Sequence, residues 1–154
     1  MRDLRAKVGL PEVPCTARSL PIALMRAREN VMGPIRAMLA DTGVTEQQWR
    51  VLRVLAEESP LDASQVAARS CLLLPSLTRI ARSMVDRGLI TVTPDTGDRR
   101  RHLLRISDAG ARVIAQNAEA AAAIVEGFKQ RLGSEDYELL LDLLAVLSDD
   151  PGRP

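Results

Sequence analysis

The chain has 154 residues, of which 46% are hydrophobic and 27% are charged, and its formal net charge is +1. This composition predicts an ordinary globular protein with one domain, or with one domain and an oligomerisation part. Trp49, Phe128 and Tyr137 are its aromatic residues. The core must therefore be aliphatic, and binding of single-stranded nucleic acid, which depends on aromatic stacking, is disfavoured.

Charge and cysteine placement narrow the class further. Residues 62–105 carry 8 basic and 4 acidic side chains, whereas residues 106–154 carry 4 basic and 9 acidic ones. A basic middle beside an acidic end is typical of a DNA-facing module with a partner element that faces away from DNA. The two cysteines make no CxxC pair or disulfide framework, and no apolar run resembles a signal peptide or a membrane span. We expect a cytoplasmic protein with no membrane partner.

The N-terminal part predicts an arm followed by a helix. Residues 1–18 contain glycine and prolines without hydrophobic periodicity, which is typical of a flexible arm. Apolar residues then recur at helical spacing from about residue 20 to 40, and Gly33-Pro34 predicts a kink or break within that helix. We interpret residues 19–44 as the first helix and part of a dimerisation region.

Two helix starts carry the signature of a capping box. Thr45 with Gln48, and Asp62 with Gln65, place a capping side chain three residues before a glutamine that can reach back. The helix after Thr45 ends before Ser59-Pro60, and the short helix after Asp62 ends near residue 70. A further helix has Pro75 in its first turn, where a missing N–H is tolerated, and ends at Gly88.

A strand, a turn and a second strand follow this last helix. Residues 89–93 are rich in β-branched side chains, residues 94–98 have turn chemistry, and residues 102–106 return as a strand. Helix, turn, helix and a basic hairpin within residues 62–105 form the outline of a winged helix-turn-helix, which inserts its second helix into a DNA groove. The predicted fold is therefore mainly α with a small β-hairpin wing, and residues 45–106 form the DNA-binding domain.

The C-terminal part predicts two more helices. Ser107 is expected to cap a long helix that stops at Gly133, and Ser134 is expected to cap the last one. Both carry long aliphatic stripes that one small winged helix cannot cover, which predicts a homodimer. We interpret residues 107–148 as dimerisation helices and residues 149–154 as a frayed tail.

The predicted DNA contacts lie on the helix after Pro75 and on the hairpin. Short hydroxyls and arginines near a helix N-terminus suit base edges and phosphates of the major groove, although the same pattern fits a solvated helix face. Three arginines at the hairpin tip favour DNA, because a ribbon with such a tip reaches a narrow minor groove, where Asp98 is placed to orient one guanidinium. The complete set is Ser64, Gln65, Pro75, Ser76, Thr78, Arg79, Arg82, Ser83, Arg99, Arg100 and Arg101.

The run GDRRRHLLRISDAG, preceded by SLTRIARSMVDRGLI, resembles the signature of MarR-type winged-helix regulators over roughly residues 20–148. The resemblance implies that Arg100 is the wing arginine that enters the minor groove and that Asp98 is its acidic partner. Three further runs, LPIALMRAREN, TEQQWRVLRVLAEESPLD and CLLLPSLTRI, are similar to the subgroup of homoprotocatechuate-degradation repressors. This likeness implies a repressor of aromatic-acid catabolism that binds double-stranded DNA as a homodimer and responds to a phenylacetate-type acid.

An aromatic acid requires a cation for its carboxylate and an apolar slot for its ring. The resemblance places such a slot between the first two helices, the long helix and the DNA-binding lobe. Arg28, with Arg26 beside it, is the candidate cation, although a surface ion pair explains Arg28 equally well. Trp49, with Gln48 or Arg53 nearby, is the candidate ring wall, although a core residue stapled to Val44 explains Trp49 more simply.

Other functions have weaker support. Cys15 lies where peroxide-sensing relatives keep a reactive cysteine, but the tyrosines that such sensors use are missing, and Cys71 is expected to be a small apolar filler of its turn. A winged-helix module that binds proteins and not DNA is the other alternative. His102 is the single histidine, and neither a phosphate-binding glycine loop nor metal-ligand spacing occurs. We expect no enzyme activity, no cofactor and no metal.

Overall fold

Both predicted capping boxes form, and they fix where two helices of the DNA-binding domain begin. In helix α3 (Glu46–Glu57) the Gln48 amide donates to Thr45 Oγ1 at 3.2 Å, and the Thr45 amide donates to Gln48 Oε1 at 3.0 Å. In helix α4 (Ala63–Arg69) Asp62 and Gln65 make the same pair of bonds, at 2.9 and 3.0 Å. Each box satisfies two backbone N–H groups that would otherwise have no partner.

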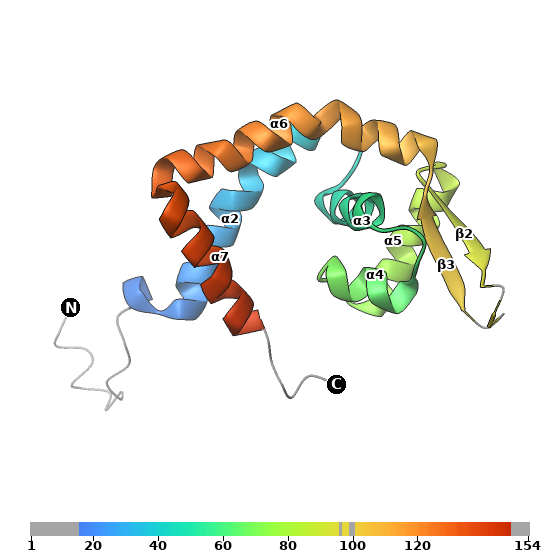
Figure 1. Ribbon diagram of the computed structural model, residues 1–154, viewed down its shortest axis with the longest axis horizontal. Coiled ribbons are helices and arrows are strands. Elements are labelled where there is room, and N and C mark those ends of the chain that lie inside the picture. The colour runs from blue at the N-terminus through green and yellow to red at the C-terminus, as the bar shows by residue number, and fades with distance from the viewer. Residues whose placement is uncertain (1–15, 96, 99–100, 149–154) are drawn as a thin grey trace, which may run out of the picture. The chain divides into compact units, whose positions relative to one another are not determined.

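The computed structural model describes residues 16–95, 97–98 and 101–148, and Figure 1 traces their elements. The chain divides into two compact units, Met1–Pro34 and Ile35–Pro154. The first unit holds the short 3-10 helix η1 (Thr16–Arg18) and most of helix α2 (Leu20–Leu39). Of the predicted kink or break at Gly33-Pro34, the break is wrong, because α2 stays helical through both residues. A helix can pass over a proline and leave one backbone carbonyl without its intrahelical donor.

Helix α5 (Leu74–Asp86) follows α4 after a short turn and packs against it. Pro75 lies in its first turn as predicted, and Gly88, with a φ of 68°, follows its C-terminal end. Cys71 in the turn is exposed and has a φ of 51°. The prediction of an apolar filler at Cys71 is wrong, because the left-handed backbone that reverses the chain there directs this side chain toward solvent.

The wing is a three-stranded antiparallel sheet with the order β1-β3-β2. Strands β2 (Ile90–Pro94) and β3 (His102–Ile106) form the predicted hairpin, with Val92 opposite Leu104. The two-residue strand β1 (Leu61–Asp62) pairs with the other edge of β3 and was not predicted. This pairing ties the middle of β3 to the start of α4.

Helix α6 (Asp108–Leu132) starts at the predicted cap, where Ser107 Oγ accepts from the Gly110 amide at 3.1 Å. It packs on α3 and then leads into helix α7 (Ser134–Ser148), which lies against its C-terminal part (Figure 1). The prediction that Ser134 caps α7 is wrong. Ser134 is already helical, and the Gly133 carbonyl before it accepts the Tyr137 amide at 3.0 Å.

The core lies between α3, α4, α5, the wing and the N-terminal half of α6, and it is aliphatic as predicted. Its fully buried side chains are Val51, Leu52, Leu55, Leu61, Val66, Leu77, Met84 and Ile90. Helix α7 buries none of its residues in this chain. Among the described residues, none of the helices is both long enough and apolar enough to cross a bilayer.

Candidate functional site

Helix α5 presents a polar face opposite its buried side. Leu77, Ile80 and Met84 anchor the helix in the core, while Thr78, Arg79, Arg82 and Ser83 are exposed and Ser76 is half-buried. Neither Arg79 nor Arg82 has a hydrogen bond or ion pair with the described part of the chain. Thr78 Oγ1 donates to the Leu74 carbonyl at 3.0 Å, so its hydroxyl remains available only as an acceptor. The guanidinium groups of Arg79 and Arg82 are therefore available as donors on this surface.

Ser64, one of the two predicted residues of α4, lies beside the tip end of β3. Ser64 and Arg101 line one surface hollow of about 350 Å³ together with Asp62 and His102. The side-chain oxygen of Gln65, Oε1, accepts a hydrogen bond from the Asp62 backbone amide. The side-chain nitrogen of Gln65, Nε2, is therefore the group of this residue that can contact a ligand. The structure thus joins the start of α4 and the wing, which lie far apart in the sequence.

A groove of about 430 Å³ separates α5 from the wing. Thr78 and Arg82 line it from the helix, and Val92 and His102 line it from the strands. His102 borders both this groove and the hollow beside α4. His102 was not among the predicted DNA-contact residues, because no neighbouring residue in the sequence indicates that β3 brings it next to α5.

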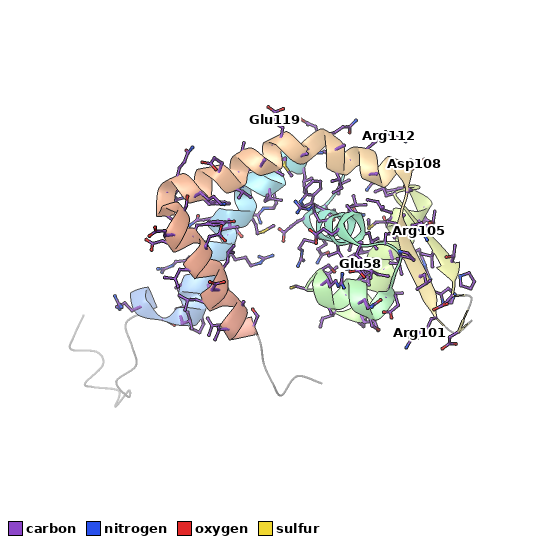
Figure 2. The ribbon with its side chains drawn as sticks, viewed as in Figure 1. Glu58, Arg101, Arg105, Asp108, Arg112 and Glu119 are labelled. Atoms are coloured by element: carbon purple, nitrogen blue, oxygen red, sulfur yellow. The ribbon has the colours of Figure 1, made fainter. Side chains whose placement is uncertain are left out.

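Hydrogen bonds join the described residues that border the wing tip. The Asp95 amide donates to the Arg101 carbonyl at 2.9 Å, the Arg101 amide donates to the Asp98 carbonyl at 2.8 Å, and Asp95 Oδ1 accepts the Gly97 amide at 2.8 Å. In Figure 2 the labelled Arg101 lies at the tip end of β3, and Arg105 lies nearer its base. The predicted minor-groove residues Arg99 and Arg100 lie outside the described residues.

Arg87, at the C-terminal end of α5, ties this helix to the start of α3. Its Nη1 donates to the Gly43 carbonyl at 2.9 Å and to Gln48 Oε1 at 3.2 Å. Gln48 is 6% exposed, and the same oxygen accepts the Thr45 amide in the capping box. The residue after Gln48 is Trp49, which lines the cavity described next. These bonds connect the end of α5 to the start of α3, the helix that carries the cavity residue Trp49.

A cavity of about 330 Å³ lies between α3 and α6. Trp49 forms its wall on α3, and small and branched side chains of α6 form most of the rest. Charged groups at its border are Arg53, which pairs with Glu57 at 3.3 Å, Lys129, which pairs with Glu138 at 3.3 Å, and Glu126. The full lining is Trp49, Arg53, Ile114, Ala118, Ala121, Ala122, Val125, Glu126 and Lys129. Such a space suits a ring with an anionic substituent.

The predicted ligand residues are only partly gathered here. Trp49, 5% exposed, and Arg53 line the cavity, whereas Gln48 does not and is engaged with Thr45 and Arg87. Arg26 and Arg28 are exposed residues of α2 in the first unit, and their role stays a prediction. Lys129 and Glu126 had not been predicted, because they follow Trp49 by more than seventy residues in the sequence.

Two further predictions concern cysteine and metal chemistry. Cys15 lies outside the described residues. Within the described ranges, His, Cys, Asp and Glu side chains form no cluster of three that could hold a metal ion.

In Figure 2 the labelled Arg112 and Glu119 project from the outer side of α6, away from α3.

Two helices joined by a turn, followed by a basic antiparallel wing, define a winged helix-turn-helix protein. The model of the MarR family matches residues 44–102. The chain is 35% identical over 130 residues to the HTH-type transcriptional regulator FarR of Neisseria gonorrhoeae, covering 84% of this chain and 89% of FarR. It is 36% identical over 131 residues to the homoprotocatechuate degradative operon repressor of Escherichia coli, covering 85% and 86%.

A solved structure agrees with these relatives. NadR in complex with 4-hydroxyphenylacetate is 33% identical, covers 91% of this chain and 98% of its own, and has a TM-score of 0.79. The chain therefore belongs to the MarR family of transcriptional regulators, which are DNA-binding proteins and not enzymes. The predicted family and fold class are confirmed.

Proposed function

We propose that this protein is a homodimeric repressor of an aromatic-acid catabolic operon, and that a small phenolic or aromatic acid releases it from a pseudo-palindromic operator. The observation that carries the proposal is the cavity of about 330 Å³ between α3 and α6, whose wall combines Trp49 with the cations Arg53 and Lys129. Two relatives support it through their names, one as the repressor of homoprotocatechuate degradation and one through its complex with 4-hydroxyphenylacetate.

The DNA side of the proposal uses α5 and the wing. In a two-fold dimer the two α5 helices would enter successive major grooves about 34–36 Å apart. Arg79 and Arg82 would contact base edges or phosphates there, and the wing arginines would enter the flanking minor grooves. Their cationic contacts displace counterions, so affinity for DNA should fall as salt increases.

The dimer is proposed from the C-terminal helices. Exposed large apolar side chains of α6 and α7 include Val125, Leu132, Leu139, Leu140, Leu143, Val146 and Leu147. A monomer seldom exposes so many apolar side chains on two neighbouring helices, and a second copy is the partner that closed two-fold symmetry provides.

The ligand side rests on the chemistry of the cavity. The ring of the acid would pack on Trp49 and on the alanines of α6, and its carboxylate would pair with Arg53 or Lys129. Glu126 is placed to accept a hydrogen bond from a phenolic hydroxyl. Arg53 pairs with Glu57 and Lys129 pairs with Glu138 in the free protein, so the carboxylate of the acid would replace or share one of these partners.

Release requires that the acid bind the DNA-free dimer more tightly than the DNA-bound one. The hydrogen bonds from Arg87 to Gly43 and Gln48 support such a coupling, because they connect the end of α5 to the start of α3, the helix that carries Trp49. A typical coupling free energy of about 1–3 kcal/mol would weaken DNA binding by roughly 5- to 150-fold.

Two titrations test the proposal on the full chain. Fluorescence anisotropy would follow binding to a labelled duplex from the region upstream of the protein's own gene, with and without saturating 4-hydroxyphenylacetate. Isothermal titration calorimetry would measure binding of 4-hydroxyphenylacetate, with 2-(4-hydroxyphenyl)ethanol as the control that has the ring but not the carboxylate. We expect the acid to bind and to weaken DNA binding, and the alcohol to do neither.

Variants separate the two halves of the proposal. Of Arg53→Ala and Lys129→Ala, the variant that removes the cation for the carboxylate should lose the response to the acid and keep DNA binding, whereas Arg112→Ala, on the outer side of α6, should behave as the wild type. If the protein showed no selective, salt-dependent binding to DNA, the proposed role as a DNA-binding regulator would be wrong. If the protein bound DNA selectively but no aromatic acid altered that binding, only the proposal of an aromatic-acid effector would be wrong.

A further inference from the structure

The run Leu72-Leu73-Leu74 leads from the helix turn into α5, and its three leucines lie in different environments. Leu72 packs against the core, but Leu73 is 71% exposed and Leu74 is 46% exposed. A single exposed leucine is ordinary on a protein surface. Two in succession at the start of the recognition helix, directly before the polar face formed by Ser76 and Arg79, form an apolar surface within the proposed DNA interface.

Leu73 differs from the N-cap residues of three neighbouring helices, because it is apolar. Thr45, Asp62 and Ser107 cap α3, α4 and α6 with their side chains, whereas Leu73 is the N-cap of α5 and makes no side-chain cap bond. A serine, threonine or aspartate at an N-cap typically stabilises a helix relative to an apolar residue. A position that forgoes both a cap and a polar surface is where a functional contact is expected.

The backbone around these leucines is held in place. The Leu77 amide donates to the Leu73 carbonyl at 2.9 Å, and Thr78 Oγ1 donates to the Leu74 carbonyl at 3.0 Å. Beneath the turn, Arg50 Nη1 donates to the Ser70 carbonyl at 2.7 Å and to the Cys71 carbonyl at 3.3 Å. The two side chains therefore project from a fixed support, which lowers the entropy lost when they bind a partner.

We propose that Leu73 and Leu74 read thymine in the operator through apolar contact with its C5-methyl group. This inference rests on the DNA binding proposed above. The occupant follows from the position of the leucines, because both are exposed at the N-terminal end of α5, and the N-terminal residues of a recognition helix meet base edges in the major groove. The thymine methyl is the apolar group that unmodified DNA presents there. Arg79 and Arg82 would then read other positions of the same half-site.

The test removes the methyl group alone. A duplex is first selected in vitro by the full-length protein, and each thymine of one half-site is then replaced by deoxyuridine, which keeps base pairing. At one or two thymines we expect the wild-type protein to lose affinity by about three- to fivefold, which is roughly the effect of one buried methyl group. Leu73→Ala and Leu74→Ala should bind the thymine duplex more weakly and should no longer distinguish thymine from deoxyuridine at the matching position.

Controls exclude an indirect effect. Leu73→Met keeps an apolar side chain and should retain the discrimination. Replacing guanines with 7-deazaguanine, which lacks the N7 acceptor, should weaken the wild type and the alanine variants by equal factors. Both leucines are exposed, so the alanine variants should unfold at the wild-type urea concentration.

The outcomes are distinct. Equal affinity of the wild type for thymine and deoxyuridine at every position, or a ratio that persists in both alanine variants, would overturn the inference while leaving DNA binding intact. The leucines would then be assigned to a protein partner. Failure to select any duplex would instead overturn the proposed function.

Discussion

Substitution of Gly110 by alanine is the most decisive perturbation of the packing that holds α6 on the DNA-binding domain. Gly110 is buried in the first turn of α6, and a Cβ added there would lie 2.2 Å from the Leu89 carbonyl oxygen. It would also lie 3.0 Å from both Ile106 Cγ1 and Leu52 Cδ2. The Leu89 carbonyl is backbone, and it already accepts the Ser107 amide at 3.2 Å, so relief requires that α6 move away from the wing.

The expected change in the free energy of unfolding is the sum of opposing contributions. Alanine is favoured over glycine in a helix by up to about 1 kcal/mol. Forcing an extra carbon into a packed core costs about 1–3 kcal/mol, and weakening the bond from Ser107 to Leu89 costs about 1 kcal/mol more. We expect Gly110→Ala to lower the free energy of unfolding by about 1–3 kcal/mol, measured by urea denaturation at fixed protein concentration.

Gly127→Ala in the same helix is the matched control. Apart from its chain neighbours and the nearby backbone of α6 itself, no described atom lies within 4 Å of a Cβ added at Gly127. Only the helix preference remains, so this variant should gain about 0.5–1 kcal/mol in the free energy of unfolding. If Gly110→Ala were as stable as Gly127→Ala, the close approach of α6 to Leu89 would not be a constraint and the reasoning would fail.

Four further predictions follow from the site. Arg50→Met should lower the free energy of unfolding by about 1–3 kcal/mol in urea denaturation, because it leaves the Ser70 and Cys71 carbonyls without their donor; wild-type stability would contradict this. Cys71→Val should cost about 1–2 kcal/mol in the same assay, because a β-branched residue resists the φ of 51°, while Cys71→Gly should be nearly neutral. Equal stabilities of these two variants would contradict the role of backbone geometry. Arg79→Ala should weaken operator binding by about 1–3 kcal/mol in fluorescence anisotropy and relax selectivity at one base pair, and an unchanged base preference would argue against base contact. Leu143→Glu should convert the proposed dimer to monomer in sedimentation equilibrium, because it puts a charge on the apolar face of α7; a persistent dimer would move the interface elsewhere.

The features predictable from the sequence are those that depend on neighbours a few residues away. The capping boxes at Thr45 and Asp62 connect residues three apart, and both form as predicted. Strand β1 was missed, because two residues show no periodicity and their pairing with β3 is decided some forty residues later. The exposure of Cys71, within a run of apolar residues, follows from a left-handed turn that composition does not show.

The candidate site shows the same limit. Ser76, Arg79 and Ser83 share one helix face, which their spacing of three and four residues predicts. The cavity combines Trp49 with Lys129 and Glu126, and its existence depends on how α6 crosses α3. Lys129, the second cation of the cavity, could therefore not be predicted from the sequence, whereas Arg53 could, because it lies one helical turn after Trp49.

Trp49 is the single tryptophan of the chain, it is 5% exposed, and it lines the candidate ligand cavity. An indole shielded from water emits at shorter wavelength than an exposed one, and an aromatic ring stacked against it alters both the intensity and the wavelength of the emission. With one tyrosine and one phenylalanine in the rest of the chain, almost all ultraviolet fluorescence of the protein comes from this side chain. The molecule therefore carries an intrinsic optical probe of whether its cavity is filled, and no label is needed.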